Sequence, residues 1–174
     1  MKRAMIGMLM MLATILLVAP AWAQRNPRGT SQISLNGKAV SVEYGRPSLK
    51  GRTTDELLGG LKAGGFWRLG ADTSTTFKSE VDLAFGKETV PAGTYSLWMQ
   101  RQEDKSWKLV FNKQHGQWGT QHDAAQDLVS VPMKEAQATA PVEMVTITLA
   151  NAGNGGTITI EWGTLKATVG FKAK

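Results

Sequence analysis

The chain has 174 residues, with 20 Lys and Arg against 14 Asp and Glu, two His, no Cys and a formal charge of +6. The absence of cysteine excludes both a disulfide framework and lipid attachment at a cysteine. Nucleic-acid-binding proteins concentrate their basic residues in stripes. Here Lys and Arg are scattered among Asp and Glu, so no nucleic-acid partner is expected.

Residues 1–23 have the order of a secretory signal peptide. MKR is a basic n-region, AMIGMLMMLATILLVAP is an apolar core, and AWA before Gln24 is a small-x-small cleavage site. An uncleaved membrane anchor is the alternative, but the apolar run is shorter than the roughly 20 residues that a span needs. We therefore expect cleavage after Ala23, a periplasmic or secreted protein, and no stable membrane span in residues 24–174.

Residues 24–174 have the length of a single domain and an apolar period of two almost throughout. Apolar and polar side chains alternate in KAVSVEY, TYSLWMQ and SWKLVFN, and again over 145–149, 158–162 and 165–171. Successive side chains of a strand point to opposite faces, so each segment can place one face on a core. We predict an all-β fold, an antiparallel β-sandwich or open barrel of about nine strands with one short helix.

Turn signals separate the predicted strands. PAG, QEDK and NAGNGG predict connections at 91–93, 102–105 and 151–156, and Gly163-Thr164 predicts a tight link between two strands. Only TTDELLGGL is typical of a helix, because a Thr can cap its start and two Gly residues follow its apolar pair.

The stretch YGRPSLKGR carries Arg46 and Arg52, and a further arginine, Arg68, follows Trp67 in the segment FWRLG. Guanidinium groups suit carboxylate or phosphate recognition, and the neighbouring rings of Tyr44 and Trp67 can stack on a guanidinium or a ligand. These arginines therefore predict a binding rim. The alternative is a solvated basic loop whose arginines pair with nearby acidic side chains.

A second candidate is HGQWGTQHD, which follows Asn112 and contains both histidines of the chain, His115 and His122. Together with Asp123 they could hold a metal or supply a general base. The spacing matches no zinc signature, so we predict no metal and no cofactor, with His115, His122 and Asp123 as a weak metal alternative. In the same loop, Trp118 is expected to cover an end of the core or to bind a flat ligand.

Three further tryptophans belong to predicted strands. Trp107 and Trp162 lie on alternating apolar faces and are expected in the core. Trp98 falls opposite the apolar face of its strand, so it is either exposed or buried against the predicted helix.

Several motifs occur in one order: YGRPSLKGR, FWRLGADTSTTF, VPAGTYSL, FNKQHGQWG and the pair Asp127-Leu128. Together they resemble the family known as domain of unknown function 2911, which occurs in secreted and periplasmic proteins of bacteria. The resemblance spans most of residues 44–171, and it implies no reaction, substrate or cofactor. Members commonly carry Asn-Glu after WR-x-GA, where this chain has Asp72-Thr73, which leaves open whether Asp72 replaces that pair.

We predict a binding module for a small anionic or carbohydrate-like ligand at one end of the sandwich. Loops at the ends of sheets commonly carry function on a rigid scaffold. The predicted site comprises Arg46, Arg52, Trp67, Arg68, Asn112, His115 and Trp118. Two alternatives are a hydrolase that uses the loop of His115, His122 and Asp123, and a module that binds another protein of the cell envelope.

Overall fold

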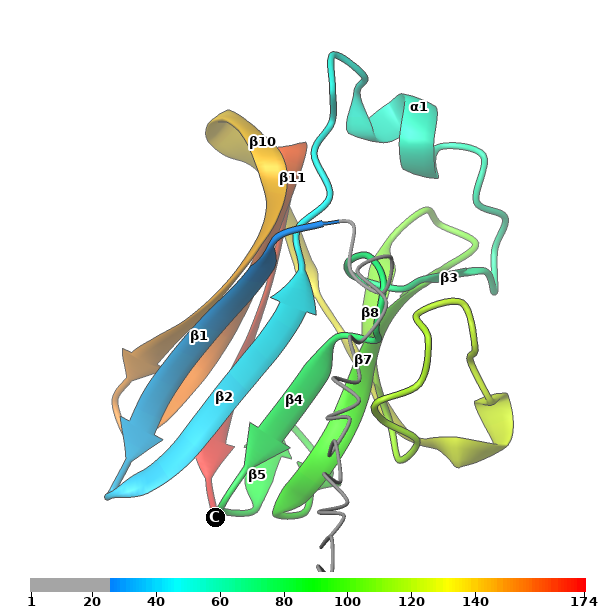
Figure 1. Cartoon of the computed structure of the whole chain (residues 1–174). Helices are drawn as coiled ribbons and strands as arrows, with labels where there is room; N and C mark the ends of the chain where they lie inside the picture. The colour runs from blue at the N-terminus through cyan, green and yellow to red at the C-terminus, as the bar shows by residue number, and fades with distance from the viewer. Residues whose placement is uncertain (1–25) are drawn as a thin grey trace, which may run out of the picture.

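The computed structural model describes residues 26–174, so the predicted signal peptide lies outside the described residues. Two antiparallel sheets pack against each other, which confirms the predicted β-sandwich (Figure 1). One sheet has the order β1-β2-β4-β7-β8-β9, with β3 also paired to β7, and the other has the order β10-β11-β5-β6. The strands are β1 (Arg28–Leu35), β2 (Lys38–Gly45), β3 (Phe66–Trp67), β4 (Thr76–Ser79), β5 (Leu83–Phe85), β6 (Glu88–Val90), β7 (Gly93–Arg101), β8 (Trp107–Asn112), β9 (Asp127–Pro132), β10 (Lys134–Ala152) and β11 (Gly155–Ala173).

The described residues thus hold 11 strands rather than about nine. Strands β3, β5 and β6 have two or three residues each, too few to show a period of two. The predicted link at Gly163-Thr164 is wrong, because β11 continues through it. Gly163 has φ +57 and sits where the register between β10 and β11 shifts. A positive φ suits a bulge as well as a turn, and the sequence does not distinguish the two.

The predicted helix forms as α1 (Thr54–Leu58), and its start follows the expected chemistry. The Thr53 side chain accepts from the backbone N–H of Glu56, whose carboxylate in turn accepts from the backbone N–H of Thr53. This capping box satisfies two N–H groups that the helix itself cannot bond. Within residues 26–174, no helix is long and apolar enough to cross a membrane.

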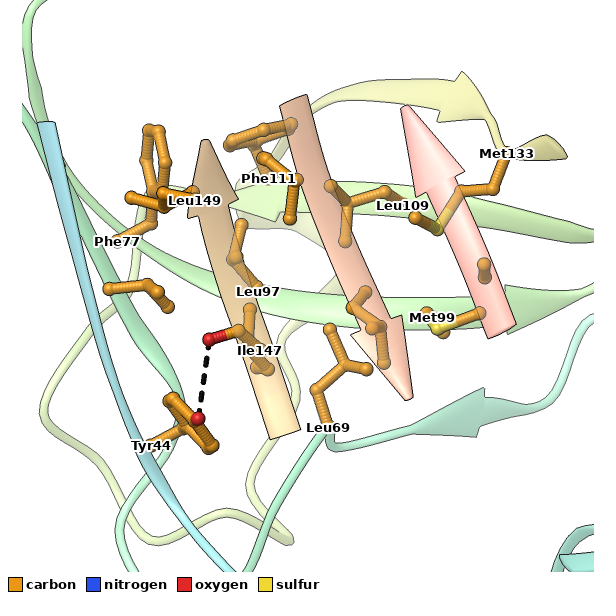
Figure 2. Packing of buried hydrophobic residues seen from close by; sticks show 14 of the residues in the cluster. Tyr44, Leu69, Phe77, Leu97, Met99, Leu109, Phe111, Met133, Ile147 and Leu149 are labelled. Carbon is orange, nitrogen blue, oxygen red and sulfur yellow. Dashed lines mark hydrogen bonds between the residues drawn. The ribbon is translucent and has the colours of Figure 1, made fainter. Parts of the chain in front are cut away.

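The core lies between the two sheets, where the alternating apolar faces meet (Figure 2). Phe77 and Phe111 from the larger sheet are fully buried, as are Ile147, Ile158 and Ile160 from β10 and β11. Burying a side chain of this kind stabilises the fold by about 1.5–3 kcal/mol.

The two predicted core tryptophans lie at one end of this core. Trp107 and Trp162 are 2% and 5% exposed, which confirms their predicted burial. Trp67 packs between them, with ring centroids 5.5 Å from Trp162 in a stacked arrangement and 6.3 Å from Trp107.

The stretch YGRPSLKGR lies against β10. The Arg46 guanidinium donates to the carbonyl of Val145 at 3.1 Å and to the hydroxyl of Thr146 at 3.3 Å. The backbone N–H of Leu49 donates to the carbonyl of Glu143 at 2.9 Å. This segment therefore ties the end of β2, in the larger sheet, to β10, in the smaller one.

Candidate functional site

A groove of about 550 Å³ lies between α1, β3, β7 and the loop formed by residues 113–123. Its volume falls within the range of roughly 300–1,000 Å³ typical of small-molecule sites. Partly buried leucines of α1 and the following turn, aromatic rings and a few polar side chains line it. The lining residues are Leu57, Leu58, Gly60, Leu61, Phe66, Trp67, Arg68, Trp98, Gly119, Thr120 and His122.

The groove lies over the outer face of the larger sheet. Leu97 and Met99 of β7 belong to the core between the sheets, and Trp98 between them points the other way. Trp98 is nevertheless only 3% exposed, and its indole N–H donates to the Ser96 hydroxyl at 2.9 Å. Gln117 of the loop donates to the same hydroxyl at 3.3 Å, so the loop covers this face of β7. The sequence left Trp98 either exposed or buried against the helix. The structure shows it buried, and the covering contacts come from the loop of Gln117 and His122.

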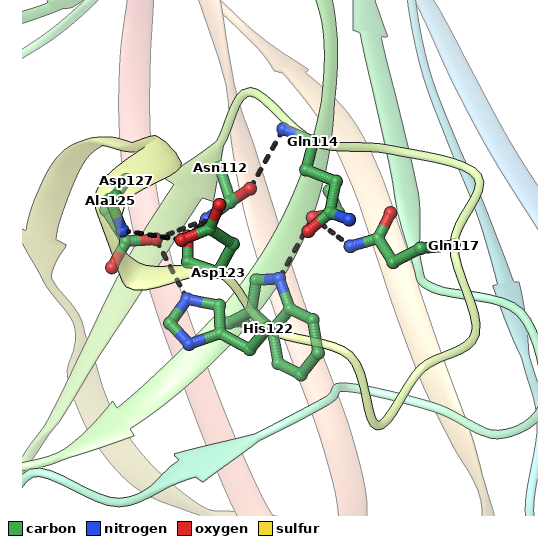
Figure 3. A network of polar contacts seen from close by, with 9 residues as sticks. Asn112, Gln114, Gln117, His122, Asp123, Ala125 and Asp127 are labelled. Carbon is green, nitrogen blue, oxygen red and sulfur yellow. Dashed lines mark hydrogen bonds and ion pairs between the residues drawn. The ribbon is translucent and has the colours of Figure 1, made fainter.

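His122 is held in one orientation by contacts on three sides. Its Nε2 lies 2.9 Å from the carboxylate of Asp127, at the start of β9 (Figure 3). Its ring is flanked by Phe66 and Trp98, with centroids at 4.0 and 4.7 Å. The side chain is 11% exposed and lines the groove. Packing and the hydrogen bond with Asp127 therefore fix the imidazole before any ligand binds.

Asn112 of β8 supports this pair through a hydrogen bond to Asp127 (Figure 3). It is fully buried, and its amide donates to the Asp127 carboxylate and to the Asp123 carbonyl, both at 2.7 Å. Its carbonyl oxygen accepts from the backbone N–H of Gln114 at 2.9 Å. Asn112 therefore fastens both ends of the loop and orients the carboxylate that holds His122.

Arg68 is half-buried, lines the groove and lies beside Gly119. Across residues 26–174 its guanidinium has no hydrogen-bond or ion-pair partner. Two acidic side chains that could pair with an arginine in this region are engaged elsewhere: Glu43 pairs with Arg28 at 2.9 Å, and Asp72 accepts from Asn26 at 2.9 and 3.2 Å. A half-buried guanidinium beside apolar walls can bind a ligand anion.

The other two arginines of the predicted site are bound to the protein itself. Arg46 donates to β10, and Arg52 donates to the carbonyl of Leu49 at 3.0 Å within its own turn. Neither of them lines the groove. The structure therefore gives Arg46 and Arg52 structural partners and leaves Arg68 as the arginine that faces the groove.

Of the four remaining residues of the predicted site, two belong to the groove or to the network behind it, and two are exposed to solvent. Trp67 lines the groove, and Asn112 lies behind it in the network that holds His122. His115 is exposed in the loop, and Trp118 is 43% exposed, so the expectation that Trp118 covers an end of the core is wrong. The backbone of Trp118 pairs with Thr73, which leaves its indole free to face solvent.

Of the residues that line the groove, the predicted binding site included only Trp67 and Arg68, and it left out the rings of Phe66, Trp98 and His122. His122 entered only as part of the hydrolase and metal alternatives, with Asp123 as its carboxylate. In the structure its partner is Asp127, five positions later, while Asp123 accepts from the backbone N–H of Ala125 at 3.0 Å. The sequence does place Asp127 five positions after His122. In a loop, however, sequence spacing does not indicate which of two nearby carboxylates pairs with a histidine.

The weak metal alternative finds no geometric support. No group of three or more His, Asp or Glu side chains in the described part of the chain is arranged to hold a metal ion. His115 is exposed, while His122 is bound to Asp127.

Asp72, at the position where family members commonly carry Asn-Glu, has a structural role in this chain. It is 5% exposed and has φ +63, and its carboxylate accepts from both the backbone and the side-chain amide of Asn26. Its backbone carbonyl accepts from Gly119 at 2.7 Å. Asp72 therefore joins the first described residues to the loop that forms the groove.

No curated protein and no solved structure matches the chain. The sequence model of one family, described as protein of unknown function (DUF2911), matches residues 26–171. That match covers both sheets, the groove and the network behind it. The chain therefore belongs to the DUF2911 family.

Proposed function

We propose that the chain is an exported binding module whose groove holds a small carboxylic acid with an apolar body. The observation that carries this proposal is Arg68, which lines a largely apolar groove and whose guanidinium has no partner among residues 26–174. A planar carboxylate suits the two parallel N–H groups that a guanidinium offers. The proposal thus keeps the anionic ligand predicted from the sequence and centres its site on Arg68.

The walls of the groove support an apolar body for the ligand. Leu57, Leu58 and Leu61 are partly exposed there, and Phe66 faces them. Each Å² of apolar surface that a ligand covers contributes about 25 cal/mol to binding, before the costs of association. A sugar is less well matched, because the one exposed tryptophan in the described part of the chain, Trp118, is not among the lining residues.

The alternative of an envelope protein as partner has less support. Trp118 is the only large apolar side chain that is exposed in the described part of the chain. Surfaces that dock proteins or membranes usually present a contiguous apolar patch of several hundred Å². A single ring on a loop does not form such a patch.

The test is a binding titration of the purified chain with straight-chain carboxylates of four to ten carbons, beside the alcohols of equal length. We expect the acids to bind more tightly than the alcohols. Arg68→Gln should weaken acid binding about 10- to 100-fold, because a hydrogen bond to a charged group contributes about 1.5–3 kcal/mol. Arg52→Gln is the matched control and should bind as the wild type does, since Arg52 lies outside the groove. Equal affinity of wild type and Arg68→Gln for every acid would refute the proposed site.

Export is the second part of the proposal, and it rests on the sequence of residues 1–23. Its test is N-terminal sequencing of the protein recovered from the periplasm or culture medium. We expect the recovered chain to begin at Gln24. Recovery of the full chain from the cytoplasm alone would refute export.

A further inference from the structure

We propose that the groove is also a hydrolytic site, in which His122 acts as a general base through Nδ1 on carboxylic esters. The proposal rests on the proposed function, because the acyl part of the ester would be the apolar acid that the groove binds. Ligand binding alone does not require a pair such as His122 and Asp127. The proposal assigns a reaction to this pair.

The hydrogen bond with Asp127 decides which nitrogen can accept a proton. An ionised carboxylate only accepts, so Nε2 at 2.9 Å from Asp127 must carry the hydrogen. In the neutral ring the lone pair then belongs to Nδ1. Among residues 26–174 no group forms a hydrogen bond with Nδ1, and Figure 3 shows the ring with one nitrogen toward Asp127 and the other directed away from it. The free nitrogen of a histidine oriented by a carboxylate is a proton acceptor for the reaction.

The surroundings of His122 favour catalysis by a fixed base. Phe66 and Trp98 flank its ring, so the side chain is already immobile before substrate binds. Among the described residues that line the groove, only His122 and Arg68 have charged or titratable side chains, and Asp127 meets His122 from β9. A charge that develops on the substrate in this largely apolar groove is therefore stabilised chiefly by Arg68.

The reaction is ester hydrolysis by water. A water molecule forms a bond from its oxygen to the ester carbonyl carbon while one of its protons passes to Nδ1 of His122. The carbonyl electrons move to the oxygen, and the resulting oxyanion faces the Arg68 guanidinium. When this intermediate collapses, the bond to the alcohol oxygen breaks and the proton on Nδ1 passes to the leaving alcohol. The products are the carboxylic acid and the alcohol, and no oxidant, reductant or metal takes part.

The first test measures hydrolysis of p-nitrophenyl esters by the purified chain, from acetate to hexanoate, against His122→Gln. Positioned general bases contribute roughly 100- to 10,000-fold. We expect saturable hydrolysis that improves with acyl length and falls at least tenfold in His122→Gln. His115→Gln is the matched control and should retain the rate, because His115 is exposed outside the groove. Equal rates for wild type and His122→Gln on every ester of the series would overturn the proposal.

The second test examines the orientation of the base. The ¹⁵N shifts of the His122 ring should show the proton on Nε2, and a proton on Nδ1 in the neutral ring would overturn the proposal. Asp127 acts through His122, so Asp127→Asn should lower kcat with little change in KM and should alter the pH profile of kcat. Loss of folding in this variant would be visible as a lower Tm, and the ¹⁵N measurement on the wild type does not depend on it.

The two proposals fail in different ways. If carboxylates bind in an Arg68-dependent manner but hydrolysis does not depend on His122, the hydrolytic proposal is wrong and the binding function stands. If neither is observed, both are wrong. If Arg68→Gln lowers both acid binding and hydrolysis while His122→Gln lowers hydrolysis alone, both are supported.

Discussion

Asn112→Ala should lower the free energy of unfolding by about 3 kcal/mol, although the substitution removes only a small polar group. Asn112 is fully buried and makes three hydrogen bonds, to Asp127, Asp123 and Gln114. Each such bond contributes a net 0.5–1.5 kcal/mol or so, and the groups left unpaired add to the loss. For a domain of this size, about 3 kcal/mol corresponds to a decrease in Tm of about 6–12 °C.

Urea titration followed by tryptophan fluorescence measures this change directly. Asn151→Ala is the matched control, because Asn151 is exposed in β10, and it should change stability by less than about 0.5 kcal/mol. A loss below about 1 kcal/mol in Asn112→Ala would refute the inference that these hydrogen bonds hold the loop.

Asn112→Asp provides an independent check with almost the same shape. It replaces a donor 2.7 Å from the Asp127 carboxylate with a second carboxylate. Like charges this close oppose double ionisation, so one of the two groups would hold its proton to a higher pH than in the unfolded chain. The variant should therefore lose stability relative to the wild type as the pH rises and recover part of it in mild acid. A deficit that is constant between pH 5 and pH 7 would contradict this reasoning.

Two further predictions concern the segment that joins the sheets. The hydroxyl of Ser48 and the backbone N–H of Lys50 donate to the Glu143 carboxylate and lower its pKa below the ordinary value. Glu143 therefore stabilises the fold at neutral pH, and this contribution is lost as the pH falls below about 4.3. The difference in stability between wild type and Glu143→Gln should be largest near neutral pH and vanish in acid, and a difference independent of pH would exclude this role. Gly45→Ala should prevent folding or lower Tm by more than about 10 °C, because the added Cβ would lie 2.1 Å from the Ala71 carbonyl oxygen. Thermal unfolding followed by circular dichroism measures this change. A Tm equal to that of the wild type would show that the backbones at Gly45 and Ala71 can separate.

Much of the fold could be predicted because it depends on local patterns. The period of two in residues 107–111 and 158–162 predicts strands, and both lie inside the observed β8 and β11. The Thr and Glu of the capping box predict where α1 begins. The two-residue strand β3 could not be predicted, because it forms only by pairing with β7. Gly163 was misassigned because its positive φ serves a bulge within a strand.

The candidate site was predicted less well, because its residues are selected by distant partners. Arg46 follows Tyr44 by two positions and Arg68 directly follows Trp67. No local pattern indicates which of the two arginines is available to a ligand. Arg46 is engaged by Val145, 99 positions later, and Arg68 faces the groove only because α1 and the loop of Gly119 close around it. The same holds for His122, which pairs with Asp127 because Asn112 turns that carboxylate toward it.

The sequence by itself determined the all-β class, the buried face of most strands and the position of the helix, because periodicity and capping act over a few residues. The tertiary structure decided which strands are neighbours and which of the three predicted site arginines lacks a partner among residues 26–174. It also decided that a loop covers the outer face of β7, so that Trp98 is buried on a face the sequence left open. Alternation assigns a side chain to one face of a strand, and only the packing of distant segments determines what that face meets.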